Sequence, residues 1–148
     1  MNFNFLSPVS DLVLAHNELL SQQALGRKLR IHSKHKGIPD LEGVSIVLLG
    51  VLENRNDQNY IGEEFQLNEI RKAFYALFPG SWNTTIADIG DINKGETVED
   101  TYFALKTIIA VLIEKKIIPI IIGGTQDLTY ANYRAYDALI PMVNIVNI

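Results

Sequence analysis

The sequence predicts a three-layer α/β/α domain built on a parallel sheet. Apolar, β-branched segments occur at residues 44–52, 84–89 and 117–122, and each leads into a polar segment. An amphipathic helical pattern follows each of these strand and loop pairs. Strands that alternate with helices favour repeated right-handed βα units, with helices on both faces of a parallel sheet.

The composition is that of an ordinary globular domain. The chain has 148 residues, of which 47% are hydrophobic and 20% charged, and its net charge is −4. An acidic protein offers no general attraction to nucleic acid or anionic lipid, so we expect neither nucleic acid nor a membrane as partner. The absence of cysteine excludes disulfides and thiolate metal sites. The first residues lack the features of a signal peptide, and we expect a cytoplasmic protein.

Residues 1–43 are predicted to form an amino-terminal helix and a basic linker ahead of the α/β portion, residues 44–148. The helix spans residues 9–25, and His16 lies on its apolar stripe, where a packed imidazole is the expected role. The predicted buried stripe consists of Val9, Leu12, Val13, His16, Leu19 and Leu20.

Residues 27–37 are densely basic and are predicted to be a solvated linker. His32 and His35 have a spacing that suits a metal ion, but the neighbouring cations oppose a divalent ion.

In the α/β portion, the first strand, residues 44–52, opens into a polar loop at residues 53–59. A helix is predicted over residues 66–78, where apolar residues recur every three to four positions until Pro79 and Gly80. Its predicted apolar stripe consists of Leu67, Ile70, Phe74, Leu77 and Phe78.

The second strand, residues 84–89, is followed by a polar segment at residues 90–95. Thr97 is a predicted cap of the next helix, whose first turn is acidic, as the helix dipole prefers. The predicted buried stripe of this helix consists of Val98, Tyr102, Leu105, Ile109 and Leu112.

The third strand starts near Pro119 and ends in a glycine pair. The following helix repeats apolar residues at Leu128, Ala131, Ala135 and Leu139, and residues 142–148 are a fourth apolar strand candidate.

The turn after the third strand is the predicted ligand site. In an open α/β sheet, ligands bind outside the carboxyl ends of the strands, where glycines let the backbone approach closely. Polar loops also occur for solvation alone, and that alternative stays open. No G-x-G-x-x-G follows the first strand, and no P-loop is present. The candidates for binding a small-molecule ligand are Gly123, Gly124, Thr125, Gln126, Asp127 and Asn147.

Three segments carry a family resemblance: residues 47–51, 86–92 and, above all, 119–129. They resemble the amino-terminal half of the ureohydrolases, which include arginase, agmatinase and formimidoylglutamase, and formimidoylglutamase is the nearest in character. The resemblance covers about residues 44–148. It implies an arginase-like fold and a family chemistry in which two Mn²⁺ ions activate a water that attacks a guanidino or formimino carbon.

The chain departs from the family at the metal ligands. Thr125, Gln126 and Asp127 stand where the family has Asp-His-Ser, so an amide replaces the ligand histidine at Gln126. Asp127 would point about 100° away on a starting helix. The other ligands of the family would lie beyond Ile148. We therefore expect an inactive ureohydrolase-like portion, a pseudoenzyme without catalytic residues, bound metal or cofactor.

Two further possibilities stay open. The chain could be a non-catalytic α/β module that binds a small ligand or another protein. Residues 142–148 either pair with the third strand, which gives a flavodoxin-like strand order 2-1-3-4, or pair with another copy. We expect the exposed sheet edge to cause some self-association.

Overall fold

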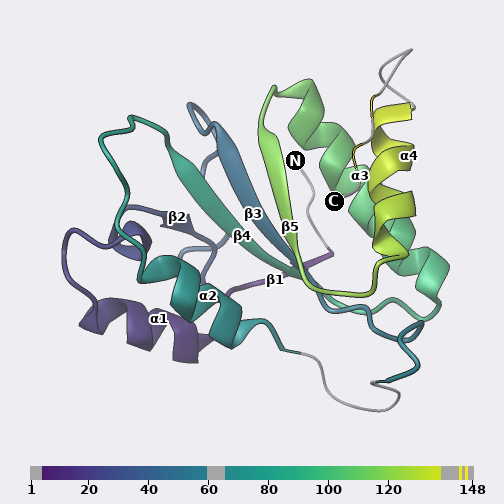
Figure 1. Cartoon of the computed structure of the whole chain (residues 1–148), viewed down its shortest axis with the longest axis horizontal. Helices are drawn as coiled ribbons and strands as arrows, with labels where there is room; N and C mark the ends of the chain where they lie inside the picture. The colour runs from purple at the N-terminus through teal and green to yellow at the C-terminus, as the bar shows by residue number, and fades with distance from the viewer. Residues whose placement is uncertain (1–4, 60–65, 138–143, 145, 147–148) are drawn as a thin grey trace.

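Three parallel strands form the centre of the sheet in the computed structural model, which describes residues 5–59, 66–137, 144 and 146 (Figure 1). They are β3 (Ile46–Val51), β4 (Ile86–Ile92) and β5 (Ile118–Ile122), in the order β4-β3-β5. This is the 2-1-3 part of the strand order that the sequence left open. The fourth strand candidate, residues 142–148, lies outside the described residues except for 144 and 146.

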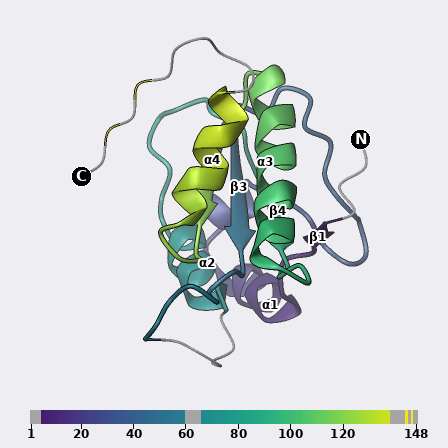
Figure 2. The ribbon, with the colours of Figure 1, turned by 90° about the vertical axis from the view of Figure 1, so that its right-hand side faces the viewer.

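Helices cover both faces of this sheet, which confirms the predicted α/β/α class. On one face lie α1 (Asp11–Leu19) and α2 (Asn68–Tyr75), and on the other lie α3 (Val98–Glu114) and α4 (Leu128–Asp137). Figure 2 shows α3 and α4 side by side against the sheet. None of the described helices is long and apolar enough to cross a membrane.

The alternation of side chains along β3 divides the core between the two faces. Val47, Leu49 and Val51 pack against the α3–α4 layer, whereas Leu48 points to the α1–α2 layer and packs with Tyr75. A strand has a side-chain period of two, so one buried strand supplies both cores. This explains why β3 is apolar throughout.

Helix α3 begins as the sequence predicts. Thr97 and Asp100 form a capping box in which each side chain accepts a hydrogen bond from the backbone N–H of the other residue. The predicted stripe is largely confirmed, since Leu105, Ile109 and Leu112 are buried. In α4, Leu128, Ala131 and Ala135 are likewise buried, and Leu139 lies outside the described residues.

The basic segment is not simply a solvated linker. Two short strands, β1 (Leu6–Ser7) and β2 (Arg30–Ile31), pair with the same edge of β4, β1 antiparallel and β2 parallel. His32 is buried, its backbone N–H donates to Asp88 O and its Nδ1 lies 2.9 Å from Ile89 O. His35, in contrast, is exposed, so the two histidines do not form a pair.

The stripe predicted on α1 is wrong in part. Leu12 and Leu19 are exposed, and Val13 and Asn17 are the buried residues of the helix. The helix ends at Leu19, and a single 3₁₀ turn, η1 (Leu25–Arg27), follows it. Asn17 is buried because its Nδ2 donates to Gly26 O in that turn, a contact that apolar periodicity does not reveal.

The stripe predicted on α2 is also wrong in part. Ile70 and Leu77 are exposed, whereas Arg71 and Tyr75 are buried. Both buried side chains bind Asp88, which β4 presents to this face of the sheet. The contact with Asp88 of β4, not apolar spacing, therefore sets the rotation of α2.

Strand β4 runs past its predicted end and includes Gly90, Asp91 and Ile92. Its pairing with β3 shifts register between Leu48 and Gly50, and Gly90 has a φ of 87°. A glycine adopts this conformation easily, so the strand bulges and continues. The segment predicted as a polar loop is therefore partly strand.

Candidate functional site

The turn between β5 and α4 lies at the carboxyl end of the parallel strands, as predicted. Gly123 and Gly124 have φ values of 87° and 75°, a backbone conformation that glycine adopts without strain. The turn is held against the loop after β3, because Thr125 N donates to Glu53 O at 3.1 Å. Two glycines thus place Thr125, Gln126 and Asp127 at the sheet edge.

A cavity of about 370 Å³ opens beside this turn. Gly123, Gly124, Thr125 and Gln126 line it together with Asn132 of α4. Gln126 is exposed, and the Oδ1 of Asn132 accepts no hydrogen bond from the described residues. Four of the predicted site residues therefore share one small, polar hollow.

Glu53 is the best-anchored carboxylate of the site. It is fully buried, and Arg55 donates to both of its oxygens, from Nε at 2.9 Å and from Nη2 at 2.6 Å. Thr101 Oγ1 of α3 donates to Oε2 at 2.9 Å. Burial alone would raise the pKa of Glu53, but these hydrogen bonds lower it from 4.5 to about 2.

Arg55 ties this carboxylate to the start of α3. Its guanidinium also donates to the carbonyl oxygens of Glu96 and Thr97, at 2.8 and 2.9 Å. The pKa of Arg55 is raised by its hydrogen bonds to Glu53. The charge of Glu53 is thereby neutralised inside the protein.

Asp127, unlike Glu53, forms hydrogen bonds with Tyr102 and Asn56. Its Oδ2 accepts hydrogen bonds from Tyr102 OH of α3 and from Asn56 Nδ2, the latter at 2.7 Å. Burial would raise the pKa of Asp127, but the nearby Thr125 and Tyr102 hydroxyls and the Asn56 amide hold it below its ordinary value. Burial and the Asp127 carboxylate together raise the pKa of Tyr102 to about 12. Asp127 therefore joins α3, α4 and the loop after β3.

The predicted candidates thus divide into three groups. Gly123, Gly124, Thr125 and Gln126 line the cavity, whereas Asp127 faces Tyr102 and Asn56. Asn147, the last candidate, lies outside the described residues.

Arg55 and Tyr102 were missed as site residues. The signal for Arg55 was its position two residues after Glu53, the first polar residue beyond a buried strand. Nothing in the spacing of Tyr102 distinguished it from its apolar neighbours on α3.

A second buried ionic cluster was also missed. The Arg71 Nε and Nη2 donate to Asp88 at 2.8 and 3.2 Å, and Nη1 donates to Asp91 at 2.7 Å. Tyr75 OH donates to Asp88 Oδ2 at 2.8 Å. Burial would lower the pKa of Arg71, but the two carboxylates raise it, and burial raises the pKa of Asp91. The sequence signal for this cluster was Asp88, an aspartate inside a largely apolar strand.

The described residues do not fit a dimanganese centre. They contain no group of three or more His, Asp or Glu side chains placed to hold a metal ion. Gln126 offers only a neutral amide oxygen, which is a weaker ligand for a divalent ion than a carboxylate or an imidazole. Glu53 and Asp127 are both engaged by protein donors.

Comparison with known proteins gives a likeness in structure only. No family model matches the chain, and no curated protein matches it in sequence. Among solved structures it is similar to the agmatine ureohydrolase of Thermoplasma volcanium, with a TM-score of 0.60 and 19% sequence identity. The match covers 82% of this chain and 41% of that protein. The chain thus has the fold of part of a ureohydrolase-like α/β domain.

Proposed function

We propose that this chain is the amino-terminal part of a ureohydrolase-like protein of the formimidoylglutamase, arginase or agmatinase type. The main support for this proposal is the turn between β5 and α4. There Gly123 and Gly124 bring the following three residues, Thr125, Gln126 and Asp127, to the carboxyl edge of a parallel sheet. The likeness to part of an agmatine ureohydrolase supports the same assignment.

Residues 1–148 do not by themselves hydrolyse guanidino or formimino C–N bonds. Such hydrolysis in this family needs metal-activated water. Gln126 stands at the histidine ligand position, and Asp127, beside it, is held by Tyr102 and Asn56. The turn is therefore retained as a structural feature without the ligands of the reaction.

Titration calorimetry with Mn²⁺ tests this proposal. The parent chain is expected to show no stoichiometric site, and it should release no urea from agmatine when Mn²⁺ is added. Gln126→Ala should behave like the parent. A site of micromolar or tighter affinity, which corresponds to about 8 kcal/mol, would overturn the proposal if Gln126→Ala abolished it. Gln22→Ala, at an exposed glutamine in the amino-terminal segment, is the matched control.

The alternative is a non-catalytic α/β module that binds a small ligand. The cavity beside the turn favours it, because Asn132 Oδ1 is buried there without a donor from the described part of the chain. Screening small polar amides and alcohols by NMR in metal-free buffer tests this alternative. Saturable shifts at the amides of Gly123, Gly124 and Asn132, reduced in Asn132→Leu, would support it, and their absence would count against it.

A further inference from the structure

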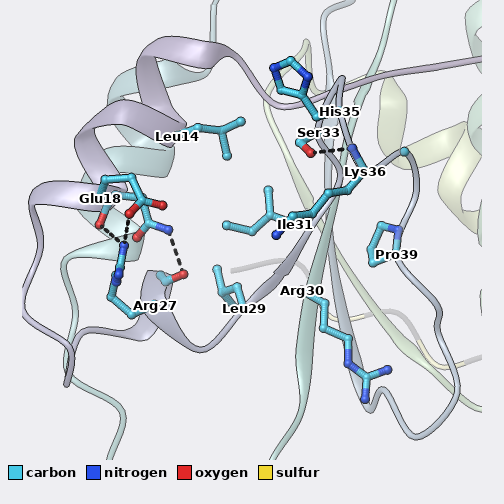
Figure 3. A pocket seen from close by; sticks show the side chains of 13 residues that line it. Leu14, Glu18, Arg27, Leu29, Arg30, Ile31, Ser33, His35, Lys36 and Pro39 are labelled. Carbon is cyan, nitrogen blue, oxygen red and sulfur yellow. Dashed lines mark hydrogen bonds and ion pairs between the residues drawn. The ribbon is translucent and has the colours of Figure 1, made fainter.

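A larger cavity lies on the other side of the molecule, between α1, η1 and β2 (Figure 3). Its volume is about 590 Å³, within the range of about 300–1,000 Å³ that is usual for ligand pockets. Leu14 of α1, Leu29 just before β2 and Ile31 in β2 provide an apolar wall, and these side chains continue the core of the α1–α2 layer. The cavity therefore has a surface suited to an apolar ligand body.

Positive charge surrounds this apolar wall. Arg27, Arg30 and Lys36 line the cavity, and Glu18 is the one carboxylate among the lining residues. Glu18 is already paired with Arg27 at 2.7 Å. An excess of cations in a protein of net charge −4 is a local feature, and it favours an anionic ligand.

Two of these cations keep their charge uncompensated. The Nη1 of Arg30 donates to the carbonyl oxygens of Asp40 and Glu42, at 2.9 and 2.8 Å. These neutral acceptors fix the guanidinium in position and leave its charge in place. Lys36 forms no ion pair with any residue that the structure describes, and its side chain is exposed. The guanidinium of Arg30 points away from the apolar wall, whereas Lys36 reaches toward Ile31, so an anion beside the wall would meet Lys36 (Figure 3).

Asn17, a buried polar residue beside the cavity, has one hydrogen-bond acceptor without a donor among the described residues. Asn17 is only 7% exposed, and it lines the cavity. Its Nδ2 donates to Gly26 O at 2.9 Å, but its Oδ1 accepts no hydrogen bond within the described ranges. A buried acceptor without a donor is unfavourable, and a ligand hydroxyl or N–H would satisfy it.

We propose that this cavity binds a small organic carboxylate with an apolar body. The carboxylate lies against Lys36, whose side chain reaches toward Ile31 (Figure 3), and the apolar body lies on Leu14, Leu29 and Ile31. The site is separate from the turn between β5 and α4, so this inference does not depend on the proposed function.

Octanoate is the probe, because it combines an apolar chain with a carboxylate. Octan-1-ol has the same chain without charge, and acetate has the charge without the chain. Calorimetry is expected to show octanoate binding at least tenfold more tightly than either control, a difference of about 1.4 kcal/mol. The amides of Leu14, Leu29 and Ile31 should shift on titration in NMR spectra.

Two charge reversals identify the contact. Lys36→Glu is expected to weaken octanoate binding by about tenfold. Lys34→Glu changes the net charge equally, but Lys34 does not line the cavity and pairs with Asp11 at 2.7 Å, so this control should stay within about threefold. Both side chains are exposed, so both variants should fold, and circular dichroism checks this.

Three results would overturn the proposal. They are equal affinities for octanoate and octan-1-ol, equal weakening in the two lysine variants, and the absence of octanoate binding tighter than about 1 mM.

Discussion

Gly124 has a backbone conformation that a residue with a Cβ adopts only with strain. Its φ is 75°, and a Cβ there would meet the carbonyl oxygen of Glu53 at 2.9 Å as well as the Leu128 side chain. We expect Gly124→Val to lower the unfolding free energy by about 2–4 kcal/mol, because left-handed strain and a steric clash add. Thermal and urea unfolding measure this change.

Thr125→Ala is the neighbouring control for the Gly124 prediction. Thr125 contributes its backbone N–H to Glu53 O, and alanine keeps that donor. The control should lose no more than about 1 kcal/mol. If both variants melted with the parent, the turn would not be restrained in the way the structure indicates.

Arg71 belongs to the most deeply buried ionic cluster of the described residues. Replacing it with methionine leaves Asp88 and Asp91 without their cation, and the expected loss is about 3–5 kcal/mol of unfolding free energy. Tyr75→Phe removes one hydrogen bond to Asp88 and should lose about 1–2 kcal/mol.

The surface pair of Lys72 and Glu69 on the same helix calibrates the Arg71 prediction. Lys72→Met should change unfolding free energy by less than about 1 kcal/mol, because exposed ion pairs contribute little. An Arg71→Met variant as stable as Lys72→Met in urea unfolding would contradict the burial of this cluster.

At the scale of elements, Glu53 joins the loop after β3 to both α3 and the start of α4. Its pKa is about 2 in the folded protein, against 4.5 ordinarily. A lowered pKa stabilises the fold above pH 4.5, and that stabilisation is lost as the pH falls through 4.5 toward 2. We expect Glu53→Gln to have a lower unfolding free energy than the parent at pH 7. Its unfolding free energy should also fall less steeply than that of the parent as the pH drops from 4.5 toward 2.

Urea unfolding at several pH values checks the Glu53 prediction. The raised pKa of Asp91 acts in the opposite direction, but it is common to parent and variant, so their difference isolates Glu53. Glu114→Gln, at an exposed glutamate, should follow the parent. If the unfolding free energies of the parent and of Glu53→Gln fell equally as the pH was lowered, Glu53 would not be held by Arg55 and Thr101.

The elements that the sequence predicted well have strong local signals. Apolar strand runs and the capping residue Thr97 determine β3, β5 and α3 from nearby residues alone. Strand β2 has only two residues, too few for any periodicity, and it exists because β4 offers a free edge. The rotation of α2 depends on Arg71 reaching Asp88, an interaction between distant residues that apolar spacing does not encode.

At the scale of the whole molecule, the position of the candidate site was predictable and its internal contacts were not. Parallel strands must end at one edge, so the glycine turn could be placed from sequence. The contacts of Asp127 with Tyr102 and Asn56, and of Glu53 with Thr101, require the loop after β3, the turn after β5 and helix α3 to meet. Loop conformations depend on those contacts themselves, so no single segment predicts them.

The edge of the sheet at β5 is a surface through which copies of the chain can associate. Among the described strands β5 pairs only with β3, and Ile118 and Ile120 are 62% and 39% exposed. These two residues share one face, because a strand alternates its side chains. An open edge beside an apolar face is a template for pairing with another chain. We propose that two copies associate through β5.

Light scattering across a range of protein concentrations measures this association. The parent is expected to gain mass as concentration rises, and the double variant Ile118→Lys with Ile120→Lys should remain a monomer, since charged side chains on an edge strand prevent pairing. Leu12→Lys with Leu19→Lys removes two exposed leucines from α1, which are 67% and 85% exposed, and adds the same charge. This control should associate like the parent. A parent that stays monomeric throughout, or a control that dissociates as fully as the β5 variant, would rule out β5 as the interface.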